Sequence, residues 1–119
     1  MDQKAADKFA AEWIAAWNAR DLDAILAHYA DDVELTSPFV REMAGESSGT
    51  LRGKAALCAY WSKALAAVPD LHFTLVRVLP GVASVTLYYH SVRNLLAAEV
   101  MELDAVGLVR RVVAHYTPE

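Results

Sequence analysis

The chain has few of the residues that build disulfide, metal or nucleic-acid sites. It has one cysteine, Cys58, so no disulfide can form within the chain, and a reducing cytoplasm is the expected compartment. The four histidines are scattered and no carboxylate pair has metal-ligand spacing, so neither a metal nor another cofactor is expected. The formal net charge is −4 and no basic cluster exceeds Arg110-Arg111, which argues against a nucleic-acid partner.

Long apolar runs and phosphate-binding glycine motifs are also missing. No apolar segment approaches the roughly 20 residues that cross a bilayer, so a membrane is not an expected partner. Gly45, Gly49 and Gly53 do not follow the strand–helix fingerprint of a phosphate loop. A hydrophobic content of 55% with 22% charged residues, over 119 residues, predicts one globular domain spanning 1–119.

Helical periodicity dominates the N-terminal half. Apolar stripes predict helices over Asp2–Ala19, over Asp21–Ala30 and from Gly53 to Pro69, with a short strand at Val33–Thr36. The segment Phe39–Arg52 has no periodicity and predicts a loop, long enough to be functional or mobile.

The C-terminal half alternates as strands do. Segments rich in Val, Leu and Tyr, separated by turn signals, predict an antiparallel meander over Leu71–Leu79, Val82–Val92, Leu95–Asp104 and Leu108–Tyr116. Three helices before this meander predict an α+β fold with Phe9, Trp13, Leu57 and Trp61 buried.

The segment Ala16–Pro38 resembles a known family. A tryptophan-bearing helix ends at Asn18, Asp21 can cap a second helix, and Asp31-Asp32 precedes a strand that ends at Pro38. This order resembles the opening of the nuclear-transport-factor-2-like superfamily, which includes ketosteroid isomerase, scytalone dehydratase and the SnoaL-like polyketide cyclases. The resemblance implies a SnoaL-like domain, cone-shaped, with three N-terminal helices packed on a strongly curved antiparallel β-sheet around a pocket.

The family comparison singles out Glu99. It stands where ketosteroid isomerases carry an aspartic acid that stays protonated and donates to a developing oxyanion. Trp13 replaces their oxyanion tyrosine and can donate one hydrogen bond but cannot act as an acid. Ser37 replaces their general-base aspartate, so ketosteroid isomerisation as the family performs it is not expected.

Strand register predicts the neighbours of Glu99. Pairing across a turn at Asp104 points Glu99 into the cone, with Arg111 and His115 at diagonal positions. Glu99 is then the acid or base, His115 its proton-transfer partner and Arg111 a tuner of the carboxylate. Burial is expected to raise the pKa of Glu99. A one-residue slip would reverse the faces and leave Glu99 an exposed strand carboxylate. Histidines in strands often serve only as hydrogen-bonded structure, which is the alternative role for His115.

The same register sets Glu102 opposite Arg110 as an exposed ion pair. It also leaves an apolar outer face that predicts a homodimer, as the resemblance also implies, made of Tyr88, Val100, Val112 and Tyr116.

Aromatic residues are the expected ligand contacts. Helical spacing makes most of them core residues, yet in a hollow fold a core aromatic can also line the pocket. The ligand-binding candidates are Trp13, Trp17, Tyr29, Tyr60, Tyr89 and Met101.

Two functions fit these residues. The first is a SnoaL-like domain that encloses a small, largely apolar organic molecule and catalyses a cofactor-free isomerisation, cyclisation or dehydration. The second is a non-catalytic ligand-binding or dimerisation module of the same superfamily, which the absence of a base at Ser37 favours.

Overall fold

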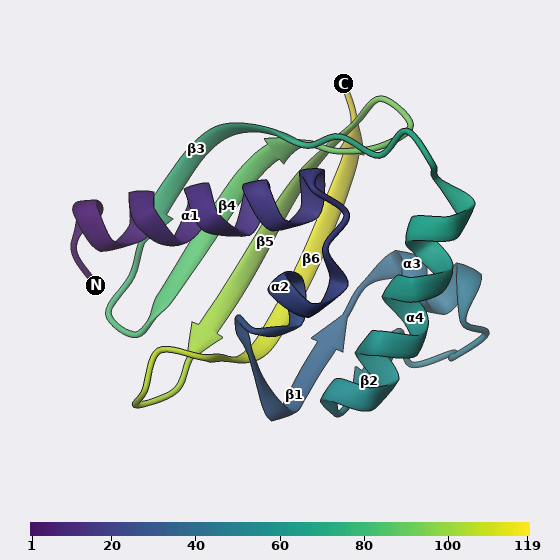
Figure 1. The fold of residues 1–119 in the computed structure, drawn as a ribbon, viewed down its shortest axis with the longest axis horizontal. Coiled ribbons are helices and arrows are strands. Elements are labelled where there is room, and N and C mark those ends of the chain that lie inside the picture. The colour runs from purple at the N-terminus through teal and green to yellow at the C-terminus, as the bar shows by residue number, and fades with distance from the viewer.

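Six strands form one curved sheet, and α1 crosses one of its faces (Figure 1). The computed structural model describes residues 1–119, and the strand order is β2-β1-β6-β5-β4-β3. The elements are α1 Gln3–Asn18, α2 Leu22–Leu26, β1 Tyr29–Thr36, α3 Pro38–Met43, β2 Thr50–Arg52, α4 Lys54–Ala67, β3 Thr74–Pro80, β4 Ser84–His90, β5 Leu95–Leu103 and β6 Val109–Pro118. The predicted α+β cone is therefore confirmed. No helix combines the length and the apolar character that a membrane span needs.

Side-chain caps mark the starts of α1 and α2. Asp2 accepts a hydrogen bond from the Ala5 N–H at 2.8 Å and begins α1, and Asp21 accepts from the Ala24 N–H at 3.1 Å and begins α2. The predicted cap at Asp21 is confirmed. However, α2 has five residues, because the chain turns into β1 already at Tyr29.

The segment Phe39–Arg52 is not the loop that we predicted, because most of α3 and all of β2 lie within it. Ser37 accepts from the Phe39 N–H and Pro38 occupies the first helical turn, a start signal sufficient for a helix too short to show an apolar stripe.

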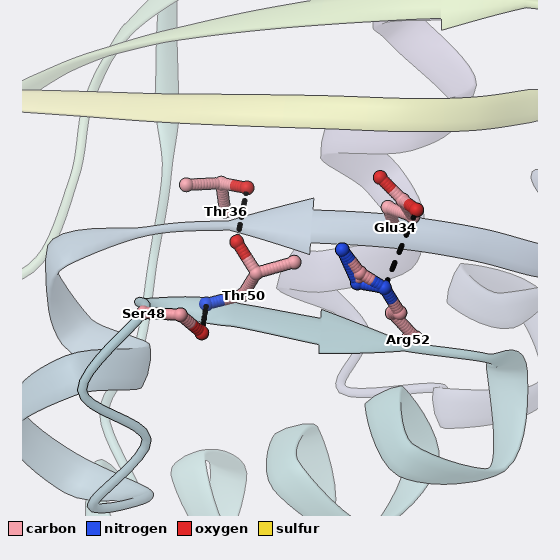
Figure 2. A network of polar contacts seen from close by, with 5 residues as sticks. All are labelled: Glu34, Thr36, Ser48, Thr50 and Arg52. Atoms are coloured by element: carbon pink, nitrogen blue, oxygen red, sulfur yellow. Dashed lines mark hydrogen bonds and ion pairs between the residues drawn. The ribbon is translucent and has the colours of Figure 1, made fainter.

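Polar pairs between facing side chains fasten β2 to β1 (Figure 2). The hydroxyls of Thr36 and Thr50 lie 2.8 Å apart, and Arg52 Nε lies 3.5 Å from a Glu34 carboxylate oxygen. Directly opposed pairs of this kind stabilise a sheet edge. They hold β2, and with it the chain that returns from α3, beside the C-terminal end of β1.

The sheet is mixed. Strands β3 to β6 form the predicted antiparallel meander, but β1 runs parallel to β6. No hairpin joins β1 to β6, so chain reversal does not dictate their relative direction.

A β-bulge at Arg110 changes the predicted register of β5 and β6. Leu103 pairs with Val109 as the turn requires, but Glu102 pairs with Arg111, so Arg110 is the extra residue. Beyond the bulge every partner shifts by one position, and Glu99 faces Ala114. A bulge of this type reverses the faces of one strand relative to its neighbour.

The shift exchanges the two faces of β6. Val112 is fully buried and Tyr116 half-buried on the inner face, whereas Arg111 and His115 are exposed on the outer face. The predicted orientation was therefore wrong for each of these four residues. The predicted ion pair between Glu102 and Arg110 is present, with 3.6 Å between nitrogen and oxygen, but the residue directly opposite Glu102 is Arg111, which forms a second ion pair at 3.6 Å.

Aromatic side chains from α1 and the sheet form the centre of the core. Trp13, Leu57 and Trp61 are buried as predicted, whereas Phe9 is only half-buried and packs edge-on against His28. Ring centroids lie 4.8 to 6.0 Å apart in the pairs Trp13–Trp17, Trp13–Phe73, Trp13–Tyr89, Trp17–Trp61, Trp17–Phe73, Tyr29–Trp61 and Phe73–Tyr89.

Asn18 fastens the end of α1 to the segment before β3. Its amide nitrogen donates to the Phe73 carbonyl at 2.9 Å, and its amide oxygen accepts from the Phe73 N–H at 2.7 Å. Asn18→Ala should lower the free energy of unfolding by about 2 kcal/mol, because both backbone groups lose their partner. Urea denaturation measures this loss. Gln3→Ala, which removes exposed hydrogen bonds, is the control and should change stability by less than about 0.5 kcal/mol. Equal losses in the two variants would contradict this role for Asn18.

Candidate functional site

The helices and the sheet enclose an apolar cavity of about 320 Å³. Its walls come from α1, α3, α4, four of the strands and the segments that connect them. Sixteen of the twenty lining residues are hydrophobic; the full set is Trp13, Trp17, Leu35, Ser37, Phe39, Met43, Tyr60, Trp61, Ala64, Ala67, Val68, Leu71, Phe73, Tyr89, Ser91, Val92, Arg93, Glu99, Ala114 and Tyr116. Few polar groups in a concave apolar wall are typical of a small-molecule site.

Glu99 is the one charged side chain buried in the protein, with 6% of its surface exposed. The Tyr89 phenol donates a hydrogen bond to its Oε2 at 2.5 Å, and no cation forms an ion pair with it. Burial raises the pKa of Glu99 to about 7, and the bond from Tyr89 partly opposes the shift. Near neutral pH the carboxyl can therefore either give up or accept a proton.

Four tyrosines lie close enough to Glu99 to be affected by its charge. Burial is the larger cause that raises the pKa of each phenol, and the nearby Glu99 carboxylate adds to it. For Tyr60 the pKa rises to about 12. Polar contacts with Ser37 and Tyr89 partly oppose the rise in the pKa of Tyr116. These phenols stay neutral, and those of Tyr60 and Tyr116, which line the cavity, can donate hydrogen bonds to a ligand oxygen.

The predicted partners of Glu99 lie elsewhere. Arg111 is exposed on the outer face and pairs with Glu102, and the exposed His115 ring lies 3.3 Å from the Ala98 carbonyl. The bulge at Arg110 turns both side chains away from the cone. The predicted cluster of Glu99, Arg111 and His115 was therefore wrong in its geometry, and only Glu99 reaches the cavity.

The predicted ligand contacts divide into two groups. Trp13, Trp17, Tyr60 and Tyr89 line the cavity, whereas two residues do not. Tyr29 is fully buried behind the wall, where its phenol oxygen accepts from the Trp13 indole at 2.9 Å. Met101 is fully buried between β4 and β6, opposite Val85 and Val112.

Three important wall residues were not predicted from the sequence. Tyr116 was assigned to the outer face because the bulge was not foreseen. Phe39 was assigned to a loop, although the Ser37-Pro38 cap could have revealed the helix that carries it. Arg93 lies in the turn between β4 and β5, where apolar alternation gives no signal.

No group of His, Cys, Asp and Glu side chains is arranged to hold a metal ion.

The sequence pattern of the SnoaL-like domain matches residues 10–117. The chain belongs to the SnoaL-like domain family.

Two solved structures of the SnoaL-like type superpose on more than nine-tenths of the chain. A SnoaL-like protein of unknown function from Burkholderia thailandensis E264 is 48% identical, with a TM-score of 0.95 over 98% of this chain and 97% of that chain. A protein proposed to be an isomerase of the SnoaL-like family, from Agrobacterium tumefaciens, is 16% identical, with a TM-score of 0.74 over 94% and 97%. At that identity the second likeness concerns the fold alone. No curated protein matches the chain.

The raised pKa of Glu99 predicts a specific dependence of stability on pH. Between about pH 4.5 and 7 the native state keeps a proton that the unfolded state releases, so stability should fall as pH rises through this window. Relative to Glu99→Gln, the free energy of unfolding of the wild type should fall by about 3 kcal/mol across it. Urea denaturation at several pH values measures this difference.

Glu102→Gln, which removes an exposed carboxyl from the same strand, is the matched control. It should keep the wild-type dependence on pH. A difference between wild type and Glu99→Gln that stays constant over the window would contradict a buried, protonated Glu99.

Proposed function

We propose that this SnoaL-like domain binds a small, largely apolar organic molecule in the cone and transfers a proton with Glu99, without a cofactor. The observation that carries the proposal is a buried carboxyl group in the wall of an apolar cavity, with a hydrogen bond from Tyr89 and no cation as a partner; burial raises its pKa to about 7. A general acid or base works best when its pKa lies near the pH at which it operates. We place this activity in the cytoplasm.

The size and polarity of the cavity limit the ligand. One water molecule, which has one non-hydrogen atom, occupies ~30 Å³ in the liquid. At that volume per atom, the cavity holds a ligand of about ten non-hydrogen atoms. The neutral phenols of Tyr60 and Tyr116 lie in the cavity wall and can donate hydrogen bonds, which favours a ligand with an oxygen acceptor. We therefore expect a one- or two-ring carbonyl compound.

Double-bond isomerisation is the reaction that a single carboxyl can complete. The Glu99 carboxylate takes a proton from the carbon between the carbonyl and the double bond. The electron pair moves to the carbonyl oxygen, which accepts hydrogen bonds from Tyr60 or Tyr116. Glu99 then returns the proton to the far end of the former double bond, so the product has the same atoms as the substrate.

Binding in the cone is tested with a fluorescence titration of naphthol, since three tryptophans line the cavity. Ala64→Phe should weaken binding by about tenfold or more, because the new ring occupies the cavity. Ala59→Phe, on the exposed side of the same helix, is the control and should leave affinity unchanged. Equal affinities in both variants would place the ligand outside the cone.

Turnover is tested with a β,γ-unsaturated cyclohexenone, whose conjugation to the α,β-isomer is followed by ultraviolet absorbance. Glu99→Gln should lower the rate by about a hundredfold or more, since the amide cannot exchange the proton. The wild-type rate should rise with pH to a plateau with a midpoint near 7, as the carboxylate forms. A rate that survives Glu99→Gln would contradict this role.

The alternative is a non-catalytic binding module. It is favoured by Ser37, which stands in place of the family's base, and by the outward position of His115, which leaves Glu99 without a second proton-transfer group. Naphthol binding without turnover of the enone would select this alternative.

A homodimer through the outer face of the sheet remains part of the proposal. Val112 and Tyr116 lie on the inner face, so the apolar residues left for such a contact are Tyr88, Val100 and Val113. Light scattering at micromolar concentration should give twice the chain mass, and a monomer mass would contradict the dimer.

A further inference from the structure

Arg93 is the only cation among the residues that line the cavity. It occupies a two-residue turn, Val92 to Leu95, in which the Leu95 N–H donates to the Val92 carbonyl at 3.1 Å. Arg93 and Asn94 both have φ of +54°, the geometry of a type I′ hairpin turn. Arginine is not among the residues that favour this conformation, which is a reason to look for a functional use of its side chain.

Two side chains of α3 hold the guanidinium at the mouth of the cone. Its carbon lies 4.7 Å from the Phe39 ring centre, and Nη1 lies 3.7 Å from a Glu42 carboxylate oxygen. Phe39 in turn packs on Tyr116, with ring centres 4.5 Å apart. The Phe39 ring therefore lies between the Arg93 guanidinium and Tyr116, a wall residue close to Glu99.

The ion pair between Arg93 and Glu42 is replaceable. More than half of each side chain is exposed, so the pair contributes at most about 1 kcal/mol. A ligand carboxylate beside the same guanidinium can take the place of Glu42 and form two parallel hydrogen bonds with it.

The cone opens at Arg93 into a second, more polar groove. The groove shares Val68, Leu71, Ser91, Val92 and Arg93 with the cavity and adds Asp70, His72 and Asn94. Asp70 is its one acid and forms no ion pair with Arg93. The guanidinium charge thus remains available on this side.

We propose that Arg93 binds a carboxylate at the outer end of the ligand, which makes the ligand class an amphipathic carboxylic acid with an apolar body in the cone. The proposal rests on the proposed function and adds to it the ligand's charge and orientation. The carboxylate must point outward, because the inner end offers an apolar wall and the acid Glu99, and the only cation lies at the mouth.

Calorimetric titration with phenylbutanoate, phenylbutanol and phenylbutylamine tests the proposal. The three probes share an apolar body and differ in charge. At low ionic strength and about pH 6, where the probe acid is ionised, phenylbutanoate should bind the wild type about tenfold more tightly than phenylbutanol.

Two variants should change the affinity for the acid in opposite directions, and a third is a control. Arg93→Gln should remove the preference for the acid and leave the affinity for the alcohol unchanged. Glu42→Gln should tighten binding of the acid by about threefold, because the competing carboxylate is gone. Arg41→Gln, which removes an exposed neighbouring cation on α3, should change neither affinity.

Equal affinities of the wild type for acid and alcohol, or tighter binding of the amine, would overturn the carboxylate site but leave the proposed function standing. Equal losses for acid and alcohol in Arg93→Gln would show that Arg93 only positions α3, and would also overturn it. Absence of binding by all three probes would contradict the proposed function itself.

Discussion

The burial of Glu99 in an apolar wall is the constraint around which the site is organised. A carboxylate without a cation is costly in such surroundings, so the group either keeps its proton or needs hydrogen-bond donors. Tyr89 supplies one donor at 2.5 Å, and the pKa settles near 7. A nearby arginine would hold the group ionised, and full apolar packing would keep it neutral. Glu99 has one hydrogen-bond donor and no cation, so it lies between these two cases and can both accept and give up a proton near neutral pH.

The cavity depends on rings that pack against one another. Trp13 stacks on Phe73 at 5.8 Å, and Phe73 packs on Tyr89 at 4.8 Å, so rings from α1, from the segment before β3 and from β4 support one another. Tyr89 serves both as part of this wall and as the donor to Glu99. Packing of the aromatic core thus sets the position of the one hydrogen bond that controls the carboxyl group.

Much of this arrangement could be predicted from the sequence. Helical stripes and strand alternation are strong signals, and they located the long helices, the meander and the inward position of Glu99. The bulge was not predictable, because Arg110 and Arg111 are identical neighbours and nothing in the pattern marks one of them as extra. Helix α3 is too short for a stripe.

The mouth of the cone could not be predicted, since the position of Arg93 follows from turn geometry rather than from periodicity. Helix α3 and this turn meet only in the folded protein, through Phe39 and Glu42. The family pattern predicted the cone and the position of Glu99, and helical and strand spacing predicted wall residues such as Tyr89, but the positions of Phe39, Arg93 and Tyr116 came only from the structure.

The chemistry of this cavity depends on whether the buried Glu99 carboxyl group titrates near neutral pH. Carbon-13 NMR of the side-chain carboxyl, assigned by comparison with Glu99→Gln, tests it most directly. We expect this titration to give a pKa of about 7 for Glu99. A value near about 4.3, that of glutamate in model peptides, would contradict it.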